Sequence, residues 1–223
     1  CSGSTAENKQ HRVLNSSTYK DAQASDFDGP YAQLFANLLV VHQSDESDFV
    51  YNIIKDSKIT GQEFQEVQNN VVKCLSAFDV KIIFAGADLM GAYGIIVPDS
   101  LKGEASPKPD NVSRGYAQCM NKIPYIDIAK LYYRILWNPQ NEDLSEYSAQ
   151  CLVKLGFESQ GFSGADFKAK YSISPEPPSG FIGPNDKVGA AQTPDSYGYN
   201  GMTYSDAINC TFNPKYVLNS RLN

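Results

Sequence analysis

Four of the five cysteines, Cys74, Cys119, Cys151 and Cys210, are the residues whose type and spacing suggest chemistry most directly. They lie far apart and form no Cys-x-x-Cys or Cys/His pair of the kind that structural zinc sites use. Widely spaced thiols are typical of disulfides in an oxidising compartment and do not favour a redox role. Three connectivities are open, and we prefer Cys74 with Cys119 and Cys151 with Cys210, because each pair then joins a helix to the next irregular segment. We therefore expect two disulfides, no metal site and no cofactor.

The fifth cysteine is the first residue, and Ser2-Gly3-Ser4 follow it. This start resembles the mature end of a bacterial lipoprotein, whose signal peptide is cut immediately before a lipid-bearing Cys. We expect Cys1 to be lipidated, and the protein to be extracytoplasmic and anchored to the cell membrane by that lipid. The alternative is a cloning start or an internal cleavage that exposes a cysteine. Without Cys1 the thiols are even in number, which suits two disulfides.

Few other residues are candidates for catalysis. His11 lies in a polar stretch, and His42 lies on an apolar helical stripe, which favours a packed or half-buried side chain. The sequence lacks Gly-x-Ser-x-Gly, Ser-x-x-Lys, His-Glu-x-x-His and nucleotide-binding glycine patterns. Paired carboxylates remain open, but Asp45-Glu46 and Glu142-Asp143 fit solvated helix starts. We predict no catalytic residue.

A calcium loop is an alternative interpretation of the segment that ends at Glu63. With Glu63 as the twelfth position of an EF-hand loop, Ile54 falls at a ligand position and Ser57 at the turn glycine. Isoleucine cannot bind calcium, whereas Thr60 and Glu63 form a capping box that begins a helix. We expect the capped helix and no calcium.

Tyrosines are the remaining candidates for recognition. The chain has 14 of them, and Tyr197, Tyr199 and Tyr204 lie close together in a Gly/Pro-rich stretch. Tyrosine gives amphipathic contact area at low entropic cost, so these three could form a binding patch. Local packing is the alternative, because tyrosines also cover thin cores.

The elements that must position these residues follow from periodicity and capping signals. We expect helices after Asp28-Gly29-Pro30, with Asp28 as N-cap, and over about 47–55, 60–77, 143–155 and 163–171, with Ser163 capping the last. Residues 80–84 and 93–97 predict a hairpin, 123–136 a helical or extended element, and 100–114 and 172–204 loops. Cys151-Leu152 echoes Cys74-Leu75, which leaves an internal duplication open.

Together these elements predict an α+β fold, with helices packed on a small antiparallel sheet, stapled by disulfides and loop-rich toward the C-terminus. Residues 1–25 are polar and without period, so we expect a flexible tether after the lipidated Cys, followed by one globular domain over 26–223.

Charge and hydropathy exclude several classes of partner. There are 25 acidic and 19 basic residues, a formal charge of −6, and no basic cluster, so nucleic acid is not an expected partner. No stretch approaches the about 18 apolar residues of a membrane-spanning helix. Any membrane attachment must therefore be covalent or peripheral.

One segment also resembles a known family. Asp56-Ser57-Lys58-Ile59-Thr60-Gly61-Gln62-Glu63-Phe64, followed by Cys74-Leu75 and later by Tyr116-Ala117-Gln118-Cys119, resembles a pattern of actinobacterial secreted lipoproteins of uncharacterised function. The likeness covers mainly residues 45–120, and Ser57 stands where the pattern favours Gly. The resemblance implies a place in the cell envelope and supplies no mechanism.

These observations favour a non-enzymatic binding or accessory protein of the envelope. Its partner would be an envelope protein, a peptide or a cell-wall glycan, with the membrane contacted through the lipid on Cys1. The main alternative is a carboxylate-dependent envelope hydrolase acting on wall glycan or peptide. A spacer or immunity-type protein is a third hypothesis.

Overall fold

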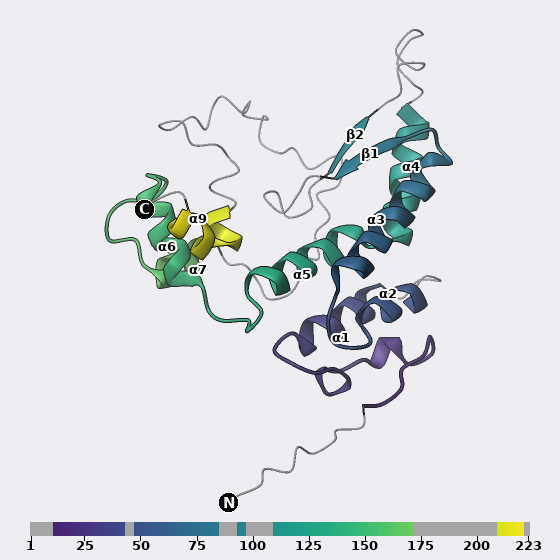
Figure 1. Ribbon diagram of the computed structural model, residues 1–223, viewed down its shortest axis with the longest axis horizontal. Helices are drawn as coiled ribbons and strands as arrows, with labels where there is room; N and C mark the ends of the chain where they lie inside the picture. Colours follow the sequence, from purple (N-terminus) through teal and green to yellow (C-terminus); the bar gives the residue numbers. More distant parts are fainter. Residues whose placement is uncertain (1–10, 43–46, 85–92, 97–108, 172–208, 221–223) are drawn as a thin grey trace, which may run out of the picture. The chain divides into compact units, whose positions relative to one another are not determined.

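The computed structural model describes residues 11–42, 47–84, 93–96, 109–171 and 209–220. The chain divides into two compact units, Cys1–Ile59 and Thr60–Asn223, and each is described here by itself. Helices dominate both units (Figure 1).

The predicted fold class is wrong, although the predicted hairpin is confirmed. β1 (Lys81–Phe84) pairs with β2 (Tyr93–Ile96) in an antiparallel ladder, in which Lys81 lies opposite Ile96. This two-stranded ladder is the only sheet in the described part of the chain. It is too small to serve as a platform, and the helices bury their apolar faces mainly against other helices, so the fold is predominantly helical and not helices on a sheet.

The first unit begins earlier than its composition suggests. The short 3-10 helices η1 (Tyr19–Asp21) and η2 (Ala24–Asp26) pack against α1 (Ala32–Val41), which also contacts α2 (Ser47–Ile54). Leu14 and Tyr19 are buried, each only 3% exposed. The expectation of a flexible tether therefore fails for residues 11–25, while Cys1 lies outside the described residues.

Ion pairs explain why this polar stretch can fold. The buried Asp26 carboxylate accepts from Arg12 Nε at 3.2 Å and Nη2 at 2.9 Å, and from the backbone N–H of Gln23 at 2.8 Å. Asp28 does not cap α1 as predicted, because its Oδ1 pairs with His11 Nε2 at 3.0 Å. The N-cap of α1 is instead Tyr31, which makes no side-chain capping bond.

The second unit opens with the predicted capped helix, α3 (Gly61–Ser76). Thr60 Oγ1 accepts from the backbone N–H of Glu63 at 3.2 Å, and Glu63 Oε2 accepts from the backbone N–H of Thr60 at 2.7 Å. The capping box is thus confirmed. The buried face of α3 consists of Phe64, Val67, Val71 and Leu75.

α4 (Pro109–Lys122) corrects the prediction of a loop over 100–114, since a helix begins within that range. It packs against α3, and Gly115 marks the close approach: a Cβ on this residue would lie 2.7 Å from Cγ of Phe78. α5 (Tyr125–Trp137) follows and also packs against α3, so the element over 123–136 is a helix.

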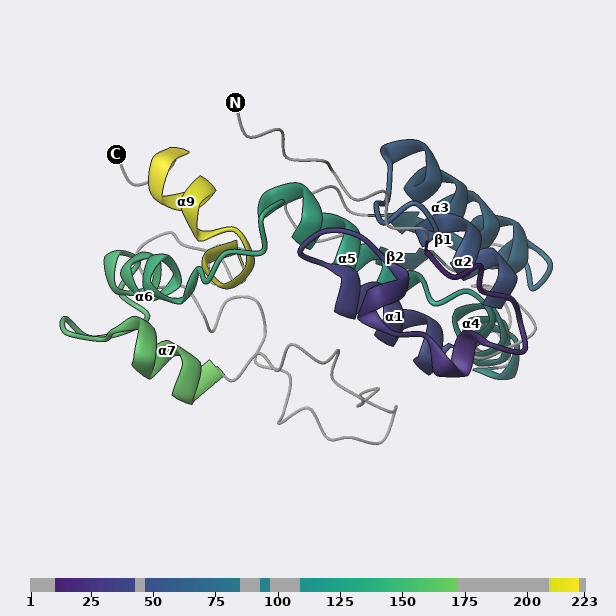
Figure 2. The same ribbon diagram turned by 90° about the horizontal axis from the view of Figure 1, so that it is seen from below.

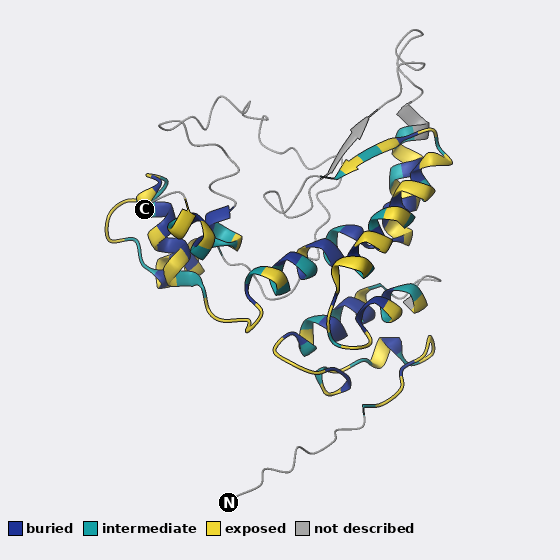
Figure 3. Ribbon diagram, in the orientation of Figure 1, coloured by how far each residue is buried: buried dark blue, intermediate teal, exposed yellow. Residues whose placement is uncertain are grey.

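The last helices form a separate hydrophobic core around α6 (Ser145–Lys154). α6 contacts α7 (Gly164–Tyr171) and α9 (Pro214–Ser220), and these helices lie together in both views (Figure 2). A short helical turn over 209–212 precedes α9. The core consists of Ala149, Cys151, Leu152, Leu155, Phe167, Cys210 and Val217 (Figure 3).

Helices α3 and α6 end with the same type of C-terminal cap. Asp79 lies five residues after Cys74, and Gly156 lies five residues after Cys151. Both residues have a left-handed backbone, with φ of 59° and 77°. The next residue donates to the leucine carbonyl in both helices, at 3.2 Å from Val80 and 2.9 Å from Phe157. This is the Schellman pattern, and it extends the sequence echo to backbone geometry.

Candidate functional site

The structure contains both disulfides that the sequence favours. Cys74 is bonded to Cys119 and Cys151 to Cys210, with Cα atoms 5.8 and 5.5 Å apart. The expectation that each bridge joins a helix to an irregular segment is wrong, because Cys119 lies on α4 and Cys210 on the helical turn over 209–212. Each bridge therefore joins helix to helix.

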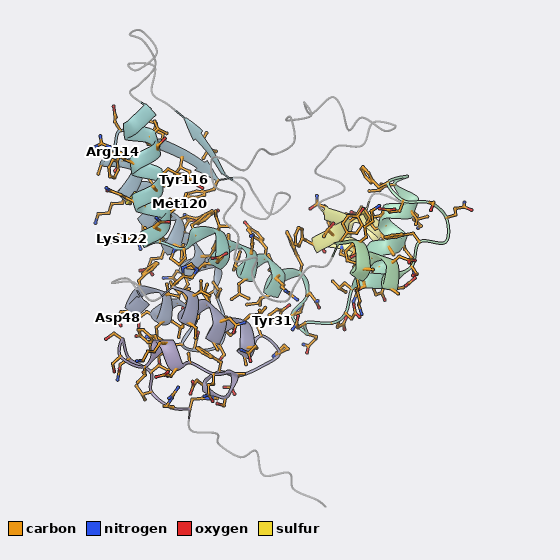
Figure 4. All side chains as sticks on the ribbon, turned by 180° about the vertical axis from the view of Figure 1, so that it is seen from behind. Tyr31, Asp48, Arg114, Tyr116, Met120 and Lys122 are labelled. Carbon is orange, nitrogen blue, oxygen red and sulfur yellow. A yellow bond between two sulfur atoms is a disulfide. The ribbon has the colours of Figure 1, made fainter. Side chains whose placement is uncertain are left out.

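The tyrosines predicted to form a binding patch belong to a part of the chain that the structure does not describe. Tyr197, Tyr199 and Tyr204 lie outside the described residues, as does Cys1. Tyr116 of the Tyr-x-x-Cys motif is half-buried on α4, one turn before the buried Met120 (Figure 4).

A different set of aromatic side chains is exposed. Among the described residues, eight large hydrophobic side chains are exposed, and the three aromatic ones are Tyr147 (43%), Phe212 (38%) and Tyr216 (51%). All three belong to the helical cluster around α6. The five exposed aliphatic side chains lie in other parts of the chain: Val13, Val41, Val72, Ile83 and Leu136. Exposed rings are thus gathered where exposed aliphatic groups are not.

The helical spacing of the residues from Cys210 to Val217 explains why the rings of Phe212 and Tyr216 are exposed. Cys210, Pro214 and Val217 occur at i, i+4 and i+7, and all three are buried. Phe212 and Tyr216, one turn apart, fall on the opposite face. The backbone N–H of Asn213 donates to Asn209 and that of Val217 to Asn213, which keeps helical geometry across the junction before α9.

Lys215 connects this helix to Tyr147 of α6. Its Nζ lies 4.9 Å from the centre of the Tyr147 ring and 2.5 Å from Oε2 of Glu142. The hydrogen bond to Glu142 raises the pKa of Lys215 above its ordinary value. We call Tyr147, Phe212, Lys215 and Tyr216 the α6/α9 aromatic face.

The scaffold beneath this face is firmly held. The Cys151–Cys210 bridge links α6, which bears Tyr147, to the helical turn over 209–212, which bears Phe212 and leads into α9 with Lys215 and Tyr216. The core residues Val217 and Leu152 are 1% and 2% exposed. A covalent link and a packed core reduce the entropy that the rings would lose on binding a ligand.

The carboxylates of the same cluster are engaged in capping and ion pairs. Asp143 accepts from Ser145 and pairs with Lys168, and these bonds hold the pKa of Asp143 well below its usual range. Glu146 accepts from the backbone N–H of Gly164 at 2.9 Å, and Asp166 accepts from Ser163, which confirms the predicted cap of α7. Asp143 thus contributes to a helix start, as predicted, whereas the Glu142 side chain pairs with Lys215. Among the described carboxylates of this cluster, no observation singles out a hydrolytic pair.

The described ranges contain no group of three His, Cys, Asp or Glu residues that could hold a metal ion. The hydroxyl and the backbone N–H of Thr60 both donate to Oε2 of Glu63, as expected for a helix cap. Ser57, at the position where an EF-hand loop has its glycine, has a left-handed backbone with φ of 61°. Within those same ranges every helix is too short or too polar to cross a membrane.

Sequence reasoning missed the α6/α9 aromatic face because its residues are scattered among ordinary helical positions. A signal was present: if Cys210 is fixed inward by a disulfide, helical spacing turns Phe212 and Tyr216 outward. Tyr147 stands one turn before Cys151 and could not be placed without the α6–α9 contact.

Comparison of the chain with protein-family models, with curated proteins and with solved structures gave no match.

Proposed function

We propose that this protein is a lipid-anchored, extracytoplasmic binding or accessory protein whose ligand contacts the α6/α9 aromatic face. The observation that carries the proposal is the gathering of three exposed aromatic rings on one disulfide-stapled cluster. The ligand classes considered are a partner protein, a peptide and a cell-wall glycan.

Exposed rings favour a binding role on energetic grounds. Each ring leaves apolar area in water, which burial would stabilise by about 25 cal/mol per Å². Scattered exposed side chains need no explanation, but exposed aromatic residues that belong to one disulfide-linked helical cluster resemble the anchors of recognition surfaces. The stapled scaffold supports this interpretation because it holds the rings before a ligand arrives.

The envelope location rests on two sequence observations. Cys1 with Ser2-Gly3-Ser4 resembles a lipidation site, and the two disulfides suit an oxidising compartment. A Cys1→Ala variant expressed behind a secretory signal peptide whose cleavage needs no cysteine should be released from the membrane fraction, whereas the parent protein expressed behind a lipoprotein signal peptide should fractionate with membranes. Membrane retention of the variant would contradict the lipid anchor.

The binding role is tested by co-sedimentation. The full chain carrying Cys1→Ala is mixed with washed bacterial envelopes, and the bound fraction is measured against protein concentration. Replacing Tyr147, Phe212 and Tyr216 together by Ala should weaken binding at least about tenfold, since each ring contributes about 0.5–1.5 kcal/mol beyond its buried area.

A matched control is the double substitution Val72→Ala with Leu136→Ala. These residues are 45% and 54% exposed, similar to the three rings, but lie on α3 and α5. The control should bind like the parent. Equal binding by the aromatic variant and the parent would refute the assignment of this face.

A further inference from the structure

We infer that the ligand of the α6/α9 aromatic face is a neutral glycan built of pyranose rings. This inference rests on the proposed function and specifies the ligand among the three classes considered.

The composition of the face distinguishes a sugar from a protein partner. Protein interfaces have cores depleted of charged residues. Here Lys215 lies over the Tyr147 ring and is paired with Glu142, and the exposed large hydrophobic side chains of this cluster are aromatic within the described residues. A pyranose ring offers a flat C–H face for stacking and a rim of hydroxyls for hydrogen bonds. The face offers the matching pair: flat rings and, beside them, a cation and a carboxylate.

The spacing of the rings suits a chain of sugars. Phe212 and Tyr216 are one helical turn apart, so their Cβ atoms are separated by about 5–6 Å, close to the length of one pyranose unit. On α6, the Tyr147 ring lies 4.9 Å from the ammonium group of Lys215. Neighbouring sugars of one chain would stack on Phe212 and Tyr216, and sugar hydroxyls would bond to the Lys215–Glu142 pair beside Tyr147.

Charge selects a neutral glycan over an anionic polymer. The single cation of the face is already paired with Glu142 at 2.5 Å, so the pair carries no net charge. The chain as a whole has a formal charge of −6, which repels polyanions. Hydroxyl and acetamido groups can share hydrogen bonds with an ion pair without breaking it.

The test separates ring stacking from general apolar contact. Tyr147→Leu with Tyr216→Leu keeps apolar side chains but removes the flat rings, whereas Tyr147→Phe with Tyr216→Phe keeps the rings and removes only the hydroxyls. The full chain with Cys1→Ala is sedimented with protein-free, purified cell-wall glycan, and a tetramer of N-acetylglucosamine is the soluble competitor. All variants must first show the parent's thermal unfolding midpoint.

For a glycan ligand, we expect the Phe pair to bind within about twofold of the parent and the Leu pair to lose about tenfold or more. The tetramer should displace the parent. Parent-like binding by the Leu pair, or failure of the parent to bind the protein-free glycan, would overturn the glycan inference. If the parent still binds whole envelopes and loses this binding in the triple Ala variant, the proposed function survives that failure. If the triple variant binds envelopes like the parent, the proposed function fails as well.

Discussion

The shared left-handed position of Asp79 and Gly156 leads to a prediction about stability. Replacing Gly156 by Ala should lower the free energy of unfolding by about 1 kcal/mol, because an L-residue pays about 1–2 kcal/mol in this conformation and recovers part of it through a less flexible unfolded chain. No atom lies within 4 Å of the position that the new Cβ would occupy. The substitution therefore isolates the backbone contribution from steric clashes.

The reciprocal substitution, Asp79→Gly, should stabilise the protein by about 0.5 kcal/mol. The gain is smaller than the loss at Gly156 because Asp tolerates the left-handed region better than Ala, and Gly adds entropy to the unfolded chain. A lower free energy of unfolding for Gly156→Ala and a higher one for Asp79→Gly are expected because both positions have the left-handed conformation of the Schellman motif.

Urea unfolding of the full chain, followed by far-UV circular dichroism with both disulfides oxidised, measures these changes. Gly61→Ala is the matched control, because Gly61 begins α3 in right-handed geometry and a Cβ there would meet only Tyr132 Oη, at 3.6 Å. This control should be neutral or stabilising by up to about 1 kcal/mol. If Gly156→Ala and Gly61→Ala changed stability equally and in the same direction, the conformational argument would be refuted.

Three further predictions concern packing, the staple and alkaline pH. Gly115→Ala should destabilise by about 1–3 kcal/mol in urea unfolding, because the new Cβ would meet Phe78 at 2.7 Å; an unchanged midpoint would contradict close α3–α4 packing. Replacing Cys151 and Cys210 by Ala should cost about 4 kcal/mol, estimated from loop closure over a separation of 59 residues, and coincident unfolding curves for variant and parent would contradict it. Burial raises the pKa of Tyr125 to about 12, above its value of about 10 in the unfolded chain. The stability from its retained proton is therefore full below pH 10 and is lost as pH rises toward 12; Tyr125→Phe should flatten that decline in thermal unfolding, and an unaltered pH profile would refute the assignment.

Local signals in the sequence predicted what depends on neighbours along the chain. The capping boxes at Thr60 and Ser163 need only residues three positions apart, and both begin helices as expected. The hairpin at 80–84 and 93–97 follows from two apolar runs around a short loop. Such features use hydrogen bonds within a few residues, so composition and order suffice to identify them.

Long-range pairing explains the errors. Residues 11–25 look disordered by composition, yet Arg12 reaches Asp26, and Leu14 and Tyr19 are buried. No local pattern shows that these partners meet. Likewise, α4 begins at Pro109 inside a Pro/Ser/Asp-rich stretch, where composition suggested a loop although Pro is favoured in a first helical turn.

The fold class failed for a related reason. Short apolar runs showed that a hairpin would form, but nothing in them revealed whether helices would cover it or pack on one another. The helix faces decided the outcome, because α3 buries Phe64, Val67, Val71 and Leu75 and packs against both α4 and α5. The size of a sheet is a tertiary property that strand propensity alone does not determine.

The two disulfide bridges also show that distance along the chain from a bridged cysteine does not determine whether a tyrosine is buried. Tyr125 and Tyr216 each follow a bridged cysteine, Cys119 or Cys210, by six residues. Tyr125 is 1% exposed and lies in an aromatic cluster with Phe64, whereas Tyr216 is 51% exposed. The same spacing from a bridged cysteine therefore leads to a buried tyrosine once and to an exposed tyrosine the other time. Burial of Tyr125 is explained by the aromatic neighbours that α3 brings to it, and such long-range contacts are what spacing along the chain does not encode.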